Sequence, residues 1–323
     1  MSEGTSTAPA AGTLLGVSRR RRRAGARLAQ RGVPYALIAP VVVTIAVVLG
    51  YPLYWLVKLS TERYGLFELI QHKGVGVGLK NYGSILHDQV FWHTLLRTIV
   101  FTAVNVTLTI VLGTLIALLL TKVSSWVRIV LSSGLVLVWS MPVVVAVQVW
   151  SWMTNYENGV LNYALTELHV GNYDQHDWLG TPTSQLAMVT TLIVWGALPF
   201  VAITLYAGLA QVPRDLLEAA SVDGANAFAS FRDITLPILK PILLILTSLS
   251  IIWDFGVFTQ AYLYIGQAKI TAGNYLMSVY LFEEGYFKSD YGRGAAISLL
   301  MLAIVAVLSV VYVRRMVRIG VEE

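Results

Sequence analysis

The chain reads Glu218-Ala219-Ala220-Ser221-Val222-Asp223-Gly224 and, nine residues later, Ile234-Thr235-Leu236-Pro237, between two long apolar runs. Polar, helix-forming residues at this place predict a helical loop that lies outside the apolar part of the fold. The small side chains of Ala219 and Ala220 permit close approach of a partner surface, and Glu218 offers a charge-assisted contact. The same residues also suit a plain connecting loop with ordinary helix capping, so both interpretations stay open.

Helix start and stop signals subdivide this loop. Pro213 suits a first-turn position, and the acidic side chains that follow it favour the positive end of a helix dipole. Gly224 can supply the turn that lets a second short helix, residues 225–234, leave at an angle. Pro237 and Pro241 are expected to break the helical pattern before the next apolar run.

The composition places most of the chain in a membrane. Of its 323 residues, 56% are hydrophobic and 13% are charged, whereas a soluble domain has about 25% charged residues. The mean hydropathy is +0.67, which favours burial in lipid over a single aqueous core. Cysteine is absent, so disulfides, thiolate chemistry and Cys-based metal sites are excluded.

Six charge-poor runs each approach or exceed the ~20 residues that cross a bilayer as a helix. They are residues 33–57, 98–121, 129–153, 186–212, 241–268 and 294–313. An even number of spans puts both termini on the same side. We therefore predict an all-α integral membrane protein with six transmembrane helices.

The distribution of cations indicates the orientation. Fifteen of the 23 Lys and Arg residues fall in segments on the side of the termini, and eight fall on the opposite side. Because the Lys/Arg excess marks the cytoplasmic side, both termini and the loop at residues 213–240 are expected to be cytoplasmic. Acidic residues lean to the outer side, where three long stretches could carry short interfacial helices.

Residues 1–32 are rich in Ser, Thr, Ala and Gly, and they carry seven arginines between Arg19 and Arg31. A cleaved signal peptide is not expected, because the apolar run that follows exceeds the usual h-region of about 7–15 residues. The segment predicts a disordered, basic cytoplasmic tail. A nucleic-acid-binding arm is the weaker alternative, and no nucleic-acid partner is expected.

The loop resembles the EAA loop of permease subunits from bacterial ABC importers, a pattern of EAA, three residues, Gly, nine residues and I-x-L-P. Every defining position is matched, and the loop precedes the penultimate span, as it does in that family. In the family this loop contacts a separate ATPase. The resemblance therefore implies ATPase-coupling roles for Glu218, Ala219, Ala220, Asp223 and Gly224.

Other segments resemble the maltose-type and oligosaccharide-type permeases of the same family. They are Gly78-Leu79-Lys80-Asn81-Tyr82, Trp152 with Asn158–Asn162, Val194–Leu209 and Asp290–Ser298. A Gly-Gly-Pro turn that is common after the fifth helix is here Gly266-Gln267-Ala268, which puts the adjoining outer loop in doubt. The resemblance implies the type I ABC importer permease fold over residues 33–318, with a cytoplasmic C-terminus at 319–323.

The partners that the resemblance implies are a second homologous permease, a cytoplasmic ABC ATPase dimer and an extracytoplasmic solute-binding protein. ATP and Mg would be bound by the ATPase, so no cofactor is expected in this chain. The implied location is the bacterial inner (plasma) membrane. The glycine-rich stretch at residues 74–80 is not G-x-x-x-x-G-K-[ST], so the chain is not expected to hydrolyse ATP. Neither a metal site nor a catalytic constellation is expected.

Asp254 is the best candidate for the solute path, because a carboxylate inside a membrane usually faces a polar cavity or a partner. It lies 13 residues past Pro241, near the middle of its predicted span. An aromatic ring beside a hydrogen-bond acceptor suits a sugar, although a structural Asp that contacts a neighbouring helix is equally compatible. The full set of path candidates is Trp253, Asp254, Phe255, Gln260, Trp195 and Gln148.

The sequence thus predicts a non-catalytic permease subunit of an ATP-driven importer, with an oligosaccharide as the favoured solute. Glycerol-3-phosphate or a polyol derivative is the alternative solute. An ion-coupled secondary transporter is the alternative from another class, but it would need more intramembrane charges than Asp254. A structural membrane scaffold would not need the loop pattern.

Overall fold

The computed structural model describes residues 14–321 and divides into two compact units, residues 1–58 and 59–323. The described part of the first unit is helix α1 (Leu14–Ser60) except for its last two residues, and the segment Leu37–Ser60 of this helix is apolar enough to cross a membrane. Residues 14–32, which we expected to be disordered, are therefore helical. Their Arg, Ala and Leu are good helix formers that extend a helix already nucleated by the span. Residues 1–13 of the predicted tail and 322–323 lie outside the described residues.

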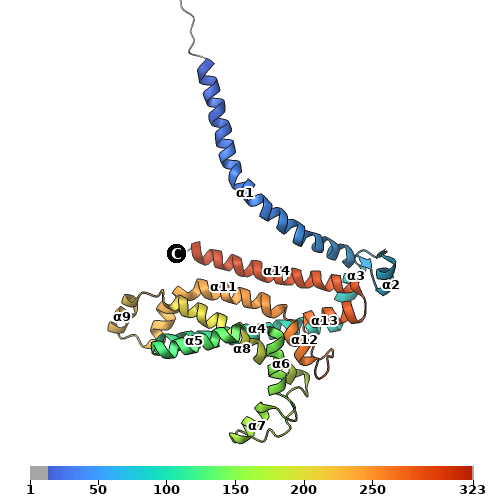
Figure 1. Cartoon of the computed structure of the whole chain (residues 1–323), viewed down its shortest axis with the longest axis vertical. Coiled ribbons are helices and arrows are strands. Elements are labelled where there is room, and N and C mark those ends of the chain that lie inside the picture. Colours follow the sequence, from blue (N-terminus) through green and yellow to red (C-terminus); the bar gives the residue numbers. More distant parts are fainter. Residues whose placement is uncertain (1–13, 322–323) are drawn as a thin grey trace, which may run out of the picture. The chain divides into compact units, whose positions relative to one another are not determined.

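The second unit is built around long helices that run side by side (Figure 1). They are α4 (Gln89–Lys122), α8 (Pro182–Leu209), α11 (Leu236–Phe255) and α14 (Tyr291–Val321). Their starts follow from the sequence. The Asp88 carboxylate accepts a hydrogen bond from the Val90 amide, 2.8 Å away, at the N-terminus of α4. Thr181 and Ser184 form a capping box at the start of α8, with Pro182 in the first turn.

Helices α4 and α8 approach closely because the seam between them carries small and polar residues. A Cβ atom on Gly113 would lie 2.6 Å from Cγ1 of Val201. Along the same face, the Asn105 amide donates to the Phe101 carbonyl at 2.8 Å and to the Thr190 hydroxyl at 3.4 Å. Small residues and hydrogen-bonding side chains are the usual means of helix association in lipid.

The third apolar run is not one straight helix, as we predicted for residues 129–153. It forms α5 (Ser125–Trp139) and α6 (Val143–Met153), which are bent by 102° relative to each other. Pro142 occupies the N-cap of α6. It lacks an amide donor and disfavours the α conformation at Met141, so the helix must end there.

The loop after α8 forms α9 (Arg214–Val222), and Pro213 is its N-cap rather than a first-turn residue. The second helix does not begin at residue 225. The Asn226 side chain caps α10 (Ala227–Ser230), accepting from the Ala229 amide at 2.9 Å.

Pro237 and Pro241 do not break the helix that follows α10. The π-turn η1 (Phe231–Thr235) leads directly into α11, and Ala227–Phe255 forms one continuous span. Pro237 lies in the first turn of α11, where the missing amide donor is tolerated. A π-turn is a common way to absorb such local misfit.

Short elements cover the end of the unit that lies opposite α9. They are β1 (Glu62–Arg63), α2 (Leu66–Gln71), β2 (Val75–Gly76), α3 (Lys80–Leu86), α7 (Val160–Glu167), α12 (Thr259–Ile265), α13 (Met277–Phe282) and η2 (Glu283–Phe287). The antiparallel pairing of β1 with β2 departs slightly from the all-α prediction. The predicted fifth span, residues 241–268, is likewise divided, because α11 ends at Phe255 and α12 starts at Thr259.

A charged cluster joins α4, η2 and α14 at this end. One Nη of Arg293 lies 2.5 Å from Oδ2 of Asp88, and its Nε lies 3.0 Å from Oε2 of Glu284. The Tyr280 hydroxyl donates to the same Asp88 oxygen at 3.0 Å. Desolvation raises the pKa of Tyr280 to about 12, so this phenol stays protonated. The cluster ties together elements that are distant in sequence.

Within residues 14–321, five helices are long and apolar enough to cross a membrane, and the bent pair α5–α6 makes six if it counts as one span. The prediction of six transmembrane segments is confirmed in this sense. The bounds differ by several residues, since charged and polar residues extend the helices beyond their apolar windows.

We expect Gly113→Ala to destabilise the protein by roughly 1–3 kcal/mol, because the added methyl overpacks the seam between α4 and α8. Val201 is β-branched and cannot rotate away easily. Thermal unfolding in detergent, followed by size-exclusion fluorescence, measures the effect. Gly134→Ala on α5 is the matched control, because a Cβ there meets nothing within 4 Å. Equal unfolding temperatures for the two variants would contradict the close approach of the two helices.

Candidate functional site

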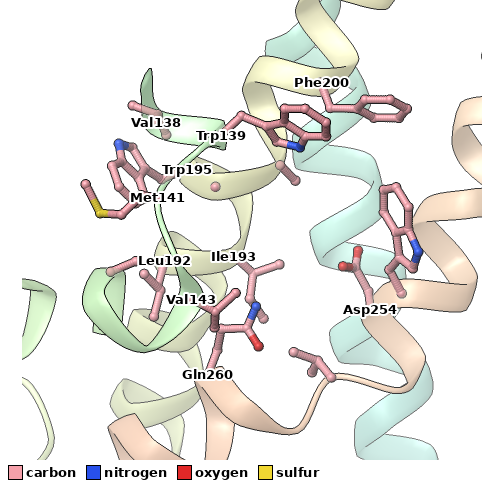
Figure 2. A pocket seen from close by; sticks show the side chains of 15 residues that line it. Val138, Trp139, Met141, Val143, Leu192, Ile193, Trp195, Phe200, Asp254 and Gln260 are labelled. Atoms are coloured by element: carbon pink, nitrogen blue, oxygen red, sulfur yellow. The ribbon is translucent and has the colours of Figure 1, made fainter. Parts of the chain in front are cut away.

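A cavity of about 300 Å³ lies where the α5–α6 bend faces α8 and the end of α11 (Figure 2). Its volume is at the lower end of the ~300–1,000 Å³ typical of small-molecule sites. The three contributing regions, α5–α6, α8 and α11–α12, are tens of residues apart in the sequence. Tertiary packing therefore assembles the site.

Aromatic side chains form much of the wall. Trp139 stacks on Phe200 with ring centroids 6.1 Å apart and an interplanar angle of 18°. Phe200 in turn contacts Trp253, with centroids 5.6 Å apart. Trp195 meets Trp150 edge to face at 5.9 Å. Trp195, Phe200 and Trp253 line the cavity together with Trp139, and their ring faces suit the C–H face of a flat, hydroxylated ligand.

Asp254 supplies the one carboxylate among the residues that line the cavity. Asp254 is only 6% exposed, and Figure 2 shows its carboxylate pointing into the cavity. No side chain that the structure describes donates a hydrogen bond to it or forms an ion pair with it. A buried carboxylate without a protein partner is costly, which favours a partner supplied by a ligand or another subunit.

Asp254 does not lie in the middle of its helix, as the sequence suggested. It is the second-last residue of α11, and Gly256 forms the C-cap. The negative end of the helix dipole does not stabilise a carboxylate there. The interruption at residues 256–258 also explains how Gln260 reaches the same cavity, because residues six apart face different sides of an unbroken helix. The Ser278 hydroxyl holds this interruption by donating to the Val257 carbonyl.

Four of the six predicted path residues line the cavity: Trp195, Trp253, Asp254 and Gln260. Phe255 does not, because it is 1% exposed and packs in a separate core cluster with Phe91 and Tyr280. Gln148 is exposed and is not among the lining residues. Neighbours of Asp254 in sequence point about 100° away on a helix, so adjacency alone misassigned Phe255.

Sequence reasoning missed the wall residues Trp139, Met141 and Phe200. The available signal was Pro142, since a proline within a long apolar run marks a break where backbone and side chains can face a cavity. Pro199, which lies inside α8 next to Phe200, carries a similar signal.

The α9 loop forms a second site at the other end of α11. Its residues Glu218, Ala219, Asp223 and Gly224 are exposed, Ala220 is half-buried, and α9 contains no buried residue. The Ala225 amide donates to the Ala220 carbonyl at 2.9 Å, and the Gly224 amide donates to Ser221 at 3.2 Å. This is a Schellman ending, which needs the positive φ of 82° found at Gly224.

Apolar side chains are exposed on and beside α9. Leu216 is 47% exposed, Val222 is 88% exposed, and Phe228 on α10 is 71% exposed. Exposed large apolar side chains next to the small residues Ala219 and Ala220 favour a protein contact surface.

The groups that line the cavity are those that bind a small, partly polar ligand. They include ring faces, one carboxylate and one amide. Among the described residues, no group of three or more His, Asp or Glu side chains could hold a metal ion.

Comparison with known proteins places the chain in a family. Residues 109–319 match the family described as the binding-protein-dependent transport system inner membrane component. The chain is 41% identical over 283 residues to the diacetylchitobiose uptake system permease protein of Streptomyces coelicolor, covering 87% of this chain and 85% of the relative. It is 34% identical to the trehalose/maltose transport system permease protein of Thermococcus litoralis, covering 87% and 92%.

Solved structures show the same fold at low identity. A bacterial ABC transporter involved in the import of the acidic polysaccharide alginate has a chain with a TM-score of 0.70 and 16% identity, covering 92% of this chain and 99% of that one. A structure of the bacterial alginate ABC transporter with its periplasmic protein gives a TM-score of 0.69 at 17% identity, covering 88% and 93%. The predicted ABC importer permease fold is thereby confirmed. The chain belongs to the family of binding-protein-dependent transport system inner membrane components.

Proposed function

We propose that the chain is a permease subunit of an ATP-driven importer and that the cavity at Asp254 lies on the path of a sugar. The observation that carries the proposal is the combination of an aromatic wall with a carboxylate that has no partner among the described side chains. Ring faces cover the apolar side of a pyranose, while Asp254 and Gln260 accept or donate hydrogen bonds to its hydroxyls.

An oligosaccharide is the favoured solute. The relatives named above are named for diacetylchitobiose and for trehalose and maltose, which supports a sugar of two or more rings. Glycerol-3-phosphate fits less well, because no Lys or Arg is among the residues that line the cavity. An anionic solute would meet the Asp254 carboxylate without a compensating cation.

The energy is expected to come from a partner. We assign the contact with a cytoplasmic ABC ATPase dimer to α9, in particular to Glu218, Ala219, Ala220, Asp223 and Gly224. ATP and Mg would be held by that ATPase. A second homologous permease would complete the translocation path, and an extracytoplasmic binding protein would deliver the sugar. The excess of Lys and Arg on the α9 side supports an orientation with α9 and both termini in the cytoplasm.

Transport would follow from two states that the ATPase stabilises to different extents. The span Ala227–Phe255 starts three residues after Gly224 and ends one residue after Asp254. Movement of α9 would therefore reach the cavity through one continuous helix. In one state the cavity would face the binding protein, and in the other it would face the cytoplasm.

Uptake by membrane vesicles that contain the whole transport system tests the proposal. Labelled diacetylchitobiose, maltose and trehalose are supplied with binding protein outside, and with either ATP or ADP inside. We expect accumulation of at least one sugar that requires ATP and that survives an ionophore. Uptake by the permease without an ATPase, or uptake abolished by the ionophore while ATP is present, would favour an ion-coupled transporter instead.

Asp254→Ala should lower the uptake of the transported sugar at subsaturating concentration by roughly tenfold or more, since hydrogen bonds to charged groups contribute about 1.5–3 kcal/mol. Gln148→Ala is the control, because Gln148 is exposed and does not line the cavity. Both variants should reach the membrane in normal amounts. Unchanged uptake by Asp254→Ala would show that the carboxylate does not contact the solute and would favour a structural role for it.

Gly224→Ala should reduce uptake by about fivefold or more, because a left-handed alanine costs roughly 1–2 kcal/mol and distorts the end of α9. ATP hydrolysis stimulated by binding protein and sugar should fall in parallel, with membrane abundance unchanged. Gly78→Ala imposes a similar strain, at φ 58°, on the opposite end of the unit. Equal losses in the two variants would argue against a coupling role that is specific to α9.

A further inference from the structure

A column of aromatic rings extends away from the cavity along α12, α13 and η2. We call Phe258, Tyr262, Phe282 and Tyr286 the aromatic column. Phe258 stacks on Tyr262 with centroids 5.0 Å apart, and Phe282 stacks on Tyr286 at 4.9 Å. The two pairs are joined by a contact of 5.0 Å between Phe258 and Phe282. The start of α12 and the contiguous segment α13–η2 therefore supply one continuous ring assembly.

The inner end of the column is continuous with the cavity. Phe258 and Tyr262 pack against a core cluster that includes Ile193 and Val257, which both line the cavity. The hydrogen bond from Ser278 on α13 to the Val257 carbonyl fixes the column to this edge. A ligand group that leaves the column at Phe258 would thus meet the side of the cavity that carries Gln260 and Asp254.

The outer end of the column is open. Tyr286 is 63% exposed, and its neighbour Phe287 is 56% exposed. They lie among Glu283, Glu284 and Lys288, in a segment between the spans Ala227–Phe255 and Tyr291–Arg315. Such charges disfavour placement of these rings in the hydrocarbon of a bilayer. Exposed aromatic rings beside charged residues favour a contact with a ligand or a partner.

We propose that the aromatic column is a second carbohydrate subsite, which receives a pyranose ring at Tyr286 before the sugar enters the cavity. This inference rests on the proposed function. Ring faces contribute area at low cost in conformational entropy and do not demand one hydroxyl pattern. The Tyr286 hydroxyl, with the carboxylates of Glu283 and Glu284 and the Lys288 ammonium close to it in sequence, supplies hydrogen-bonding groups at this end of the column. A solute longer than one ring could contact the column and the cavity in succession.

The absence of cysteine from the chain allows a direct test with single-cysteine variants of the full transport complex in vesicles. Phe287→Cys places a thiol beside the column, because the Phe287 ring lies 5.8 Å from that of Tyr286, and it leaves the four column rings intact. Ala197→Cys reports on the cavity. Leu168→Cys, at a position 73% exposed and outside both sites, is the control. A small methanethiosulfonate reagent labels each thiol with or without diacetylchitobiose, maltose or trehalose.

At about ten times the half-saturating sugar concentration, labelling of Phe287→Cys should slow by about tenfold, because only the unoccupied fraction reacts. Adding Tyr286→Ala should abolish this protection and leave that of Ala197→Cys. Leu168→Cys should be unaffected throughout. Protection that is independent of Tyr286 would contradict the column as the binding element.

Other outcomes separate the column from the proposed function. Protection of Ala197→Cys without protection of Phe287→Cys would overturn the column and leave the sugar cavity standing. Protection of neither would overturn both for these sugars. A Phe287→Cys thiol that reacts in the isolated subunit but not in the complex would show that another subunit covers the column, which also overturns the inference.

Discussion

The structure depends on one constraint, which is that polar backbone groups within an apolar fold must find partners inside the protein. Continuous helices meet this constraint everywhere except at breaks, and irregular backbone is tolerated where it is buried or lines a cavity. In the part of the chain that the structure describes, two such breaks interrupt the apolar runs, at residues 140–142 and 256–258. Met141 and Val257, one from each break, line the same cavity. The two breaks in the helices therefore form part of the wall of the cavity.

The same constraint explains the character of the cavity residues. Asp254 and Gln260 are placed on either side of the second break, and the helix that carries Asp254 ends immediately after it. Other buried polar side chains of the apolar core are neutral: Asn105 and Thr98 on α4 donate hydrogen bonds to backbone carbonyls, whereas the hydroxyls of Thr102 and Thr109 have no hydrogen-bond partner among the described residues. A carboxylate without a partner costs more to bury than a hydroxyl or an amide, because its charge must be desolvated, and this is the physical reason for giving it a role in binding.

The α9 loop is exposed and the cavity is buried, and the span Ala227–Phe255 runs from one to the other. The loop exposes small and apolar side chains, which suit a contact surface, and it ends on Gly224, whose positive φ glycine adopts readily. In the cavity, by contrast, the Asp254 carboxylate is buried. The span Ala227–Phe255 connects them without a break, because η1 accommodates Pro237 at the start of α11. A rigid connection between an exposed surface and a buried site is well suited to transmit displacement.

The sequence by itself determined the membrane class, the six apolar runs and the helical loop with its glycine ending, because hydropathy, proline and glycine act over a few residues. It also identified Asp254 as unusual, since one carboxylate in an apolar run is visible without coordinates. Only the tertiary structure decided which side chains share the cavity. Phe255 adjoins Asp254 in sequence yet packs in another core, while Trp139 and Phe200 come from distant helices. The bend at Pro142 and the break at Gly256 set these directions, and the angle of a break depends on what packs against it rather than on the residues that cause it.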